Sequence, residues 1–455
     1  MDPQLLSSLA QWAHGTVQGG PAETPVRRVN TDSRALQEGD LFVALRGERH
    51  DGHQYLAQAA AQGAAAALVD TLPSERPPNL PLILVPDTLA GLQAIASAYR
   101  AQLPLRVVGI TGSNGKTSTK DFTAGVLGQQ YPVTKTEGNF NNHIGLPLTL
   151  LRAGGEHTWG VVEMGMNHPG EIAPLAKMAR PEIGIITNIG VAHIEHMGSR
   201  EAIAQEKGSL AEALPSEGFL VLNADDDFAE YLAGRTAART VRTGIEQGEV
   251  QARNLQPHFS GVRFTLQADG RSVPVDLPVP GLHMVRNALL AVAAGRLAGI
   301  PLEGCAEGLR QMQLTKGRLE QKLIRGVHVL DDTYNANPDS MAAALRTLAQ
   351  LPTPGRRVAV LGAMGELGVE AERGHREVGQ VAAEVAVDYL LTVGEPARWT
   401  AASATAGGLG RVLHCADAEE AAAALRAWVQ EGDIVLVKGS RSARMERVVE
   451  AMQRP

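Results

Sequence analysis

The stretch Arg106-Val-Val-Gly-Ile-Thr-Gly-Ser-Asn-Gly-Lys-Thr-Ser-Thr119 determines how the middle of this chain folds. A run rich in β-branched residues ends in a glycine turn, and Lys116 and Thr117 follow where a helix is predicted to begin. Gly112 and Gly115 allow the backbone to approach an anion closely, and the amides at the helix start point towards it. Lys116 can reach terminal phosphates, and the Thr117 hydroxyl can ligate Mg²⁺. The stretch therefore predicts a phosphate-binding loop between a strand and a helix.

The spacing of this loop is shorter than that of the general P-loop. Ile110 stands five residues before Gly115, where the general motif has its first glycine. The shorter Gly-x-x-Gly-Lys-Thr form, preceded here by Thr111, is less common and therefore more discriminating. The alternative is a glycine-rich turn that happens to contain Lys-Thr. We expect the loop to be completed by the other polar residues of the stretch, Ser113, Asn114 and Ser118.

Composition indicates a globular α/β protein. The chain has 455 residues, 44% of them hydrophobic and only 4% aromatic, which suits about three domains with cores of Ala, Leu and Val. A net charge of −7 gives no reason to expect nucleic acid as a partner. The two cysteines cannot form a disulfide framework, and no run reaches the ~20 apolar residues of a spanning helix. We expect a cytoplasmic protein without membrane insertion.

Strand and helix patterns predict three domains. Residues 1–87 are predicted to form a small α/β domain, 88–315 a central domain with a P-loop ATPase-like, mostly parallel sheet, and 316–455 a Rossmann-like, doubly wound domain. The predicted strands are 40–45, 65–69, 82–85, 159–163, 183–188, 261–266, 327–331, 357–361, 388–393 and 433–437. The predicted helices are 54–63, 89–102, 285–297 and 302–313.

Two buried runs of the central domain end in polar residues. Glu163 closes the run 159–163, and Asn188 closes the run 183–188. Ligands bind at the carboxyl ends of parallel strands, so both side chains are predicted to lie where chemistry occurs. Mg²⁺ prefers oxygen ligands and usually bridges phosphates to one or two carboxylates. Glu163 is therefore the candidate carboxylate, with an ordinary strand-end glutamate as the alternative.

Histidine and lysine residues follow the second of these runs. His193 and His196 are three residues apart, one helical turn, so both could face one ligand. Beside a phosphate-bound Mg²⁺ an imidazole can serve as a ligand, although a structural loop histidine gives the same spacing. Lys207 lies in a predicted helix, where the spacing alone favours a solvated lysine.

The last domain carries two polar segments at predicted strand ends. Asp331-Asp-Thr-Tyr-Asn-Ala-Asn-Pro338 ends in good turn and helix-capping chemistry, whereas its two aspartates are free to bind a ribose hydroxyl. Lys438-Gly-Ser-Arg-Ser-Ala-Arg444 carries three cations and two hydroxyls, which suit an anionic substrate group or a charged surface loop. Gly362-Ala-Met-Gly-Glu-Leu-Gly368 lacks the glycine spacing of a dinucleotide loop, so we reject NAD binding there.

Taken together, these segments resemble the Mur ligase family, the ATP-dependent amide-forming enzymes of peptidoglycan precursor assembly. The resemblance runs in family order over nearly the whole chain. It is carried by Thr111–Thr119, Glu137–Pro147, Glu163–Gly165, Thr187–Gly198, Gly281–Asn287, Lys316–Glu320, Asp331–Pro338 and Lys438–Arg441. In the first domain, Asn30–Arg34 and Asp40–Leu45 look like the family's UDP-sugar-binding domain.

The resemblance implies roles at an ATP and Mg²⁺ site. Lys116 and Thr117 match the phosphate-loop pair, Glu163 a ligand of a first Mg²⁺ and His193 a ligand of a second. Lys207 matches a lysine that is commonly carbamylated in this family, which turns an ammonium into a carboxylate able to ligate Mg²⁺. Several siblings have an acid before the histidine, whereas Ala192 stands here, a departure that fits the tripeptide-accepting branch. The remaining residues expected at the nucleotide are Asn142, Asn287 at adenine, Arg318 at the γ-phosphate and Asp332 at ribose.

The resemblance also implies substrates. The Asn139–Pro147 and Tyr334–Pro338 stretches look like the branch that joins D-alanyl-D-alanine to a UDP-N-acetylmuramoyl-tripeptide. The residues expected to bind these substrates are Ser33 and Arg34 at the uridine diphosphate, with Asn335, Asn337, Lys438, Ser440 and Arg441 in the last domain. The implied enzyme acts through an acyl phosphate and is a monomer. The alternatives are another ligase of the family, a folylpolyglutamate synthase, or a P-loop ATPase that works as a switch.

Overall fold

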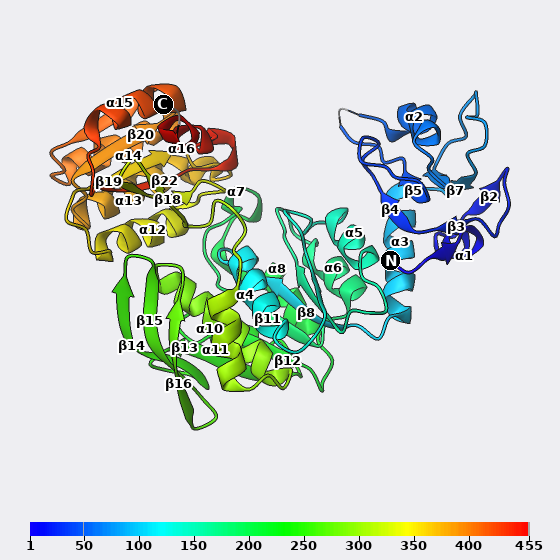
Figure 1. Ribbon diagram of the computed structural model, residues 1–455, viewed down its shortest axis with the longest axis horizontal. Helices are drawn as coiled ribbons and strands as arrows, with labels where there is room; N and C mark the ends of the chain where they lie inside the picture. Colours follow the sequence, from blue (N-terminus) through cyan, green and yellow to red (C-terminus); the bar gives the residue numbers. More distant parts are fainter. Residues whose placement is uncertain (49, 454–455) are drawn as a thin grey trace. The chain divides into compact units, whose positions relative to one another are not determined.

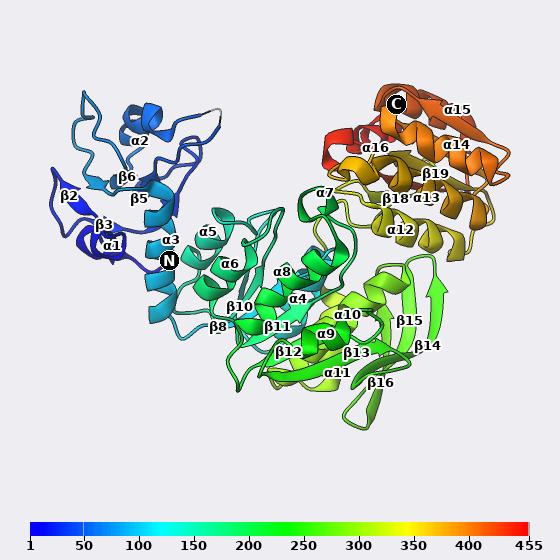
Figure 2. The same cartoon turned by 180° about the vertical axis from the view of Figure 1, so that it is seen from behind.

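The computed structural model describes residues 1–48 and 50–453, and it divides into two compact units. The first unit comprises Met1–Gly109, Tyr131–Met166 and Glu171–Glu182, and the second comprises the rest of the chain. Figure 1 colours the chain along its sequence, and Figure 2 shows it from behind. Among the described residues, no helix has the length and apolar character needed to cross a bilayer.

The first unit contains a five-stranded sheet in the order β2-β7-β6-β5-β4. Neighbours from β4 to β7 pair in parallel, and β2 pairs antiparallel with β7. A small core that includes Phe42, Leu56 and Leu82 fills the space under the sheet. The strands of the sheet are β2 (Thr16–Gln18), β4 (Arg28–Asn30), β5 (Asp40–Val43), β6 (Ala66–Val69) and β7 (Leu82–Leu84). Around it lie β1 (Gln4–Leu5), β3 (Pro25–Val26), α1 (Leu6–Trp12), η1 (Gly52–Tyr55) and α2 (Leu56–Ala61).

The rest of the first unit follows the long helix α3 (Thr88–Gln102). Asp87 caps α3 by accepting a hydrogen bond of 2.7 Å from the amide of Ala90. Later in the chain, β9 (Val133–Lys135) pairs in parallel with β10 (Trp159–Glu163), and α5 (Gly145–Leu151) and α6 (Ile172–Ala179) accompany them. Tyr99 and Arg100 tie α3 to this part, because they donate to the carbonyls of Ala153 at 2.8 Å and Ala179 at 2.9 Å.

The central part of the second unit begins where β8 (Arg106–Thr111) runs into α4 (Lys116–Leu127). Its neighbouring strands β11 to β14 pair in parallel, and β14, β15 and β16 form an antiparallel meander. The strands are β11 (Ile183–Ile186), β12 (Phe219–Asn223), β13 (Arg239–Ile245), β14 (Val250–His258), β15 (Gly261–Ala268) and β16 (Arg271–Leu277). The helices are α7 (Ile194–Met197), α8 (Arg200–Glu212), α9 (Ala229–Ala233), α10 (Leu282–Leu297) and α11 (Leu302–Gln311).

The C-terminal part of the second unit holds a six-stranded sheet in the order β17-β18-β22-β19-β20-β21. Every pair is parallel except β17 with β18. The strands are β17 (Glu320–Ile324), β18 (Val327–Asp332), β19 (Arg357–Gly362), β20 (Tyr389–Val393), β21 (Val412–Cys415) and β22 (Ile434–Lys438). The helices are α12 (Pro338–Gln350), η2 (Gly368–Glu370), α13 (Ala371–Glu384), η3 (Glu395–Ala397), α14 (Arg398–Ala406), α15 (Ala418–Trp428), η4 (Arg441–Ala443) and α16 (Glu446–Gln453).

The predicted α/β class is confirmed, and each predicted strand and helix overlaps an observed one. β17, which forms a hairpin with β18, was not predicted from the sequence. The hairpin turn is Arg325-Gly326, with φ of 53° and 76°, a two-residue turn of the kind that matches the twist of paired strands. Arginine is unusual in that conformation, so the turn carries no strong sequence signal. The predicted domain boundaries stay a prediction.

Candidate active site

The phosphate loop of the second unit has room for backbone but not for side chains. Gly112 has φ of 148°, and a Cβ there would lie 1.8 Å from Thr187 Oγ1. Gly115 caps α4 with φ of 80°, and a Cβ there would lie 2.5 Å from Asn287 Oδ1. Thr187, directly after β11, and Asn287 on α10 therefore occupy the space next to the loop. Only glycine satisfies both conformation and space at these two positions.

Residues that follow β11 hold this loop in place. The amides of Ser113 and Asn114 donate to the carbonyl and side-chain oxygens of Asn188 at 2.9 and 3.0 Å. Thr187 Oγ1 donates to the carbonyl of Asn114 at 2.5 Å, and the amide of Gly190 donates to Ser113 Oγ at 2.9 Å. The strand-end asparagine found in the sequence is thus a structural support of the loop. The cradle is fixed by the fold before any ligand binds.

Two cations lie at the start of α4. Lys116 Nζ donates to the carbonyl of Gly112 at 2.8 Å, so the lysine folds over its own loop. Arg318 Nη2 donates to the hydroxyl of the buried Thr117 at 3.3 Å, and its guanidinium lies 4.1 Å from the ring centroid of Tyr334. Ser118 is buried in the same helical turn. An anion bound to this helix start would meet both cations.

Lys207 lies on α8 with a side chain that is 1% exposed. Loss of hydration lowers the pKa of Lys207 well below its ordinary value, the charge of Lys116 lowers it further, and Glu206 opposes both effects. Within residues 1–48 and 50–453, no side chain or carbonyl accepts a hydrogen bond from its amine. Burial that lowers the pKa of an amine favours its uncharged, nucleophilic form. The solvated helix lysine favoured by spacing alone is wrong, because the side chain is buried.

His193 adopts a left-handed conformation with φ of 63° just before α7. Its Nδ1 lies 2.6 Å from Oε2 of Glu366, and this contact lowers the pKa of the Glu366 carboxyl. His196 instead contacts the ring of His168, with centroids 4.5 Å apart. The two histidines therefore have separate partners in this structure, and their sharing of one ligand stays a prediction.

The oxygen and nitrogen donors of this unit fit a divalent cation held partly by phosphate. Thr117 Oγ1 lies at the helix start, and Lys207 is a buried amine without a partner in the described part of the chain. The charge of Lys116 affects the pKa of both Lys207 and Glu366, so these groups share one electrostatic environment. The described residues contain no group of three or more His, Cys, Asp and Glu side chains arranged to hold a metal ion. A cation here would depend on phosphate oxygens for much of its coordination.

Asp332 and Lys438 form a buried ion pair at the carboxyl ends of β18 and β22. Their strands are adjacent, the two residues are register partners, and Oδ2 lies 2.6 Å from Nζ. Lys438 Nζ also donates to the carbonyl of Asn335 at 2.9 Å. Burial lowers the pKa of Lys438, and Asp332 opposes this shift. Burial also lowers the pKa of the nearby His283 to about 4, so that imidazole is neutral near pH 7.

The other predicted substrate residues of the second unit lie on the same side of that sheet. Asn337 caps α12 by accepting from the amide of Ser340 at 2.9 Å, and its Nδ2 donates to Asn114 Oδ1 at 2.7 Å. Ser440 is buried and donates to the carbonyl of Ala363 at 2.7 Å. Arg441 is exposed, and its Nη1 lies 3.7 Å from Glu446. The substrate loop is therefore linked to the phosphate loop through one side-chain amide.

In the first unit, predicted residues occupy strand and helix ends. Glu163 ends β10 and accepts a hydrogen bond of 2.8 Å from Asn141 Nδ2. Asn142 Oδ1 accepts from the amides of Ile144 and Gly145 at 3.1 and 2.9 Å, just before α5. Arg34 makes two hydrogen bonds to Asp32 at 2.9 and 2.8 Å, which lowers the pKa of Asp32 to about 2. Ser33 is buried beside this pair.

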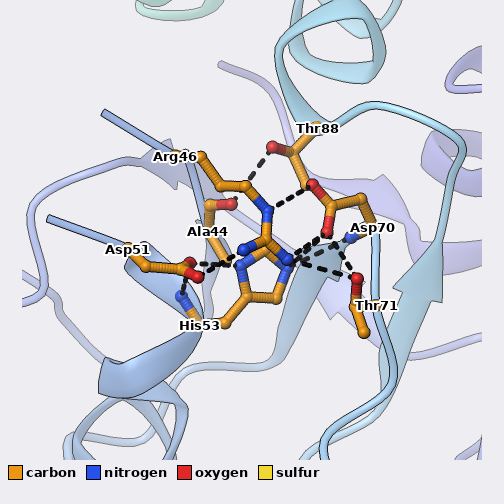
Figure 3. Close-up of polar contacts among 7 residues, drawn as sticks. All are labelled: Ala44, Arg46, Asp51, His53, Asp70, Thr71 and Thr88. Carbon is orange, nitrogen blue, oxygen red and sulfur yellow. Dashed lines mark hydrogen bonds and ion pairs between the residues drawn. The ribbon is translucent and has the colours of Figure 1, made fainter. Parts of the chain in front are cut away.

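A second polar cluster lies at the carboxyl ends of β5 and β6 (Figure 3). The guanidinium of Arg46 contacts Asp51 and donates to both oxygens of Asp70, at 3.1 and 2.8 Å, and to Thr71 Oγ1 at 3.2 Å. His53 lies between the same two carboxylates, with Nδ1 2.7 Å from Asp51 Oδ1 and Nε2 accepting from the amide of Asp70 at 3.2 Å. The cluster ties the segment after β5 to the segment after β6. It stands at the same sheet edge as the loop that follows β4.

Sequence reasoning missed several of these residues. Glu366 and His283 carry no spacing signal, because the residues that they contact lie far along the chain. Arg46 was detectable, since it follows a buried parallel strand as Glu163 does. A search for charged residues directly after every predicted strand would have found it.

A phosphate loop between a parallel strand and a helix, two cations at that helix start and a buried lysine with a lowered pKa define a nucleotide-dependent phosphoryl-transfer enzyme. Family models described as "Mur ligase family, catalytic domain", "Mur ligase middle domain" and "Mur ligase, glutamate ligase domain" match residues 25–100, 110–295 and 317–441. The chain belongs to the Mur ligase family, as its sequence resemblance predicted.

Individual relatives cover the whole chain. The UDP-N-acetylmuramoyl-tripeptide–D-alanyl-D-alanine ligase of Escherichia coli is 40% identical over 98% of both chains. The crystal structure of MurF from Acinetobacter baumannii is 33% identical, covers 100% of both chains and gives a TM-score of 0.91. The MurF ligase of Thermotoga maritima in complex with ADP is 30% identical over 94% of this chain and 97% of its own, with a TM-score of 0.82.

Proposed function

We propose that this protein is an ATP-dependent ligase that joins D-alanyl-D-alanine to a UDP-N-acetylmuramoyl-tripeptide in peptidoglycan precursor synthesis. The observation that carries the proposal is the identity of 40% with the Escherichia coli ligase of that name over 98% of both chains. The phosphate loop, the two cations beside it and the buried lysine are the parts that such a reaction needs. We assign the reaction to the cytoplasm and propose that the enzyme is a monomer.

The chemistry has two steps. A carboxylate oxygen of the tripeptide attacks the γ-phosphorus of ATP, the bond to ADP breaks, and an acyl phosphate forms. The amine of D-alanyl-D-alanine then attacks the acyl carbon, loses its proton, and expels phosphate as the amide forms. The first step brings two anions together, so cations must offset the repulsion.

Lys116 and Arg318 are assigned to the γ-phosphate. Their positions at the start of α4 support this role, because Lys116 covers the loop and Arg318 donates to Thr117. Bound Mg²⁺ would supply positive charge at the transferring phosphoryl group. From the family resemblance, Thr117 and Glu163 are each proposed as a Mg²⁺ ligand, and His193 and Lys207 are proposed as ligands of a second cation. Asn142, Asn287 and Asp332 are assigned to the nucleotide.

Lys207 is proposed to act as a carbamate. The neutral amine attacks CO₂, an N–C bond forms, and the proton leaves to solvent. The product is a carboxylate in place of a buried base. Burial of the amine and the lowered pKa of Lys207 support this step, since both favour the nucleophilic form.

The two other substrates are assigned to the remaining polar loops. Ser33 and Arg34 are proposed to bind the uridine diphosphate, because the guanidinium of Arg34 is exposed at a sheet edge. Asn335, Asn337, Lys438, Ser440 and Arg441 are proposed to bind the dipeptide. Arg441 supplies the exposed cation of this set for a terminal carboxylate.

The test is a reaction of the purified protein with ATP, the UDP-linked tripeptide and D-alanyl-D-alanine. We expect ADP, phosphate and the pentapeptide product in equal amounts by mass spectrometry. Oxygen-18 placed in the tripeptide carboxylate should appear in the released phosphate, which marks the acyl phosphate. Lys116→Ala should stop the formation of all three products.

Two outcomes would contradict the proposal. Phosphate release that does not depend on the dipeptide would favour a P-loop ATPase that works as a switch. Product formation only with a different amino acid or with a folate would favour another ligase of the fold. In both cases the oxygen-18 label separates hydrolysis by water from transfer through the carboxylate.

A further inference from the structure

The segment Gly362–Gly368 has no role in the reaction described above. It follows β19, the middle strand of the parallel set in the C-terminal sheet. Within it Glu366 has φ of 59°, a left-handed conformation that costs a non-glycine residue about 1–2 kcal/mol. Strained residues of this kind persist where the surrounding structure holds them, and they cluster at functional sites.

The Glu366 carboxylate reaches the loop that carries His193. Oε2 of Glu366 lies 2.6 Å from Nδ1 of His193, and His193 is itself in a left-handed conformation with φ of 63°. Two strained residues therefore meet across this contact. In this structure the Nδ1–H of His193 and the Glu366 oxygen are not aligned as in a good hydrogen bond. Such contacts in active sites often align only when the ligands are bound.

A second C-terminal residue fixes the same loop. The amide of Val191 donates to Oδ2 of Asp339 at 3.0 Å. A Cβ on Gly190 would lie 2.2 Å from that oxygen, so the loop and the start of α12 are in close contact. The backbone on which His193 stands is thus held independently of the contact with Glu366. This leaves Glu366 to act on the imidazole ring itself.

The contact with Glu366 determines which nitrogen of the His193 ring carries the proton. A carboxylate beside Nδ1 favours the tautomer with the proton on Nδ1, which leaves the lone pair of Nε2 free to bind a metal ion. No hydrogen bond involves Nε2 of His193 among the residues that the structure describes. The outer nitrogen of the ring is thus the one that remains for a ligand.

We propose that Glu366 is a positioning residue that fixes the tautomer and orientation of His193 for the second Mg²⁺ site. This inference rests on the proposed function, which assigns that cation to His193. Because Glu366 comes from the C-terminal part and His193 from the central part, the cation site is completed by two segments 173 positions apart in the sequence. A purely structural ion pair would not depend on which ring nitrogen carries the proton.

The first test reads the tautomer without any metal. Protein labelled with nitrogen-15 histidine gives separate imidazole signals by NMR, and His193→Gln identifies that of His193. We expect the wild type to hold the proton on Nδ1 and Glu366→Ala to shift the population towards Nε2. Glu366→Gln keeps an acceptor oxygen and should give an intermediate result. An unchanged tautomer in Glu366→Ala would refute the proposal.

The second test counts cations. Mn²⁺ titrated into the protein with ADP is followed by electron paramagnetic resonance, and two sites are expected. Glu366→Ala should weaken one of them by about 10–100-fold, the usual effect of removing a partner of a metal-bound histidine. Glu370→Ala is the matched control, because Glu370 lies four residues away and pairs with Arg373. It should leave both affinities unchanged.

The outcomes separate this inference from the proposed function. Two sites of native affinity in Glu366→Ala would overturn the positioning role, and a single site in the wild type would overturn both that role and the second cation. Neither result bears on ligation, which is decided by product formation in the wild type. A loss of activity in Glu366→Ala with unchanged tautomer and Mn²⁺ binding would also count against the inference.

Discussion

Replacement of Lys207 by methionine should stabilise the protein while it stops the reaction. The lysine side chain is 1% exposed, and burial lowers the pKa of its amine far below the ordinary value. Within the described chain nothing accepts a hydrogen bond from the amine, and folding removes almost all of the side chain's contact with water. Burial of an unsatisfied polar group costs about 1–3 kcal/mol in protein variants. Methionine has a similar length and reach and avoids that cost.

The free energy of unfolding is therefore expected to increase by about 1–3 kcal/mol in Lys207→Met. This corresponds to a rise of about 2–12 °C in the thermal midpoint of a domain of 150–250 residues. The assay is thermal unfolding in bicarbonate-free buffer, so that the amine stays unmodified. Ligation is measured on the same samples. Lys177→Met is the control, because Lys177 is exposed on α6 and its replacement should move the midpoint little.

The stability advantage of Lys207→Met over the wild type should also change with pH. An unfolded lysine binds a proton up to pH 10.5, whereas the buried one loses it at lower pH. Between these two values the unfolded state binds more protons, so wild-type stability rises with pH. The advantage of Lys207→Met should therefore shrink as pH rises towards 10.5. A variant that melts at or below the wild type, or a control that shifts equally, would refute the burial argument.

Three further changes test the site. Asp332→Asn should lower the free energy of unfolding by about 3–5 kcal/mol, since it leaves the ammonium of Lys438 buried and unpaired. Urea unfolding measures this loss, and the double variant Asp332→Leu/Lys438→Met should show a smaller one. Gly115→Ala should raise the KM for ATP at least tenfold with little change for the UDP substrate, because the new methyl would meet Asn287; equal kinetics would contradict the cradle geometry. Arg34→Ala should raise the KM for the UDP substrate more than that for ATP, and the reverse order would remove the assignment of Arg34.

Local patterns predicted most of the fold. The buried runs that became β10, β11 and β18 end in polar residues, and these ends lie where ligands bind in parallel sheets. The phosphate loop was visible because its chemistry is contained in one short segment. The capping role of Asn337 was visible for the same reason, since its partner Ser340 is three residues away.

Long-range pairings could not be predicted in this way. The Asp332–Lys438 pair joins residues that are distant in the chain, and the register between β18 and β22 creates it. The contact between His193 and Glu366 depends on two left-handed residues that are not glycine. The burial of Lys207 was hidden as well, because a helix places a lysine inside or outside according to what packs against it.

Asn337 places an evolutionary constraint on the phosphate loop. The side-chain oxygen Oδ1 accepts a hydrogen bond from the first turn of α12, and the side-chain amide nitrogen Nδ2 donates to Asn114. One side chain therefore joins the start of a helix to the phosphate loop. Ionised aspartate would serve the helix but has no proton to donate to Asn114. Serine offers one short hydroxyl in place of separate acceptor and donor atoms, and glutamine sets its polar atoms one carbon further out. Sequence drift at this position should consequently be confined to asparagine, even in lineages whose neighbouring residues have diverged widely.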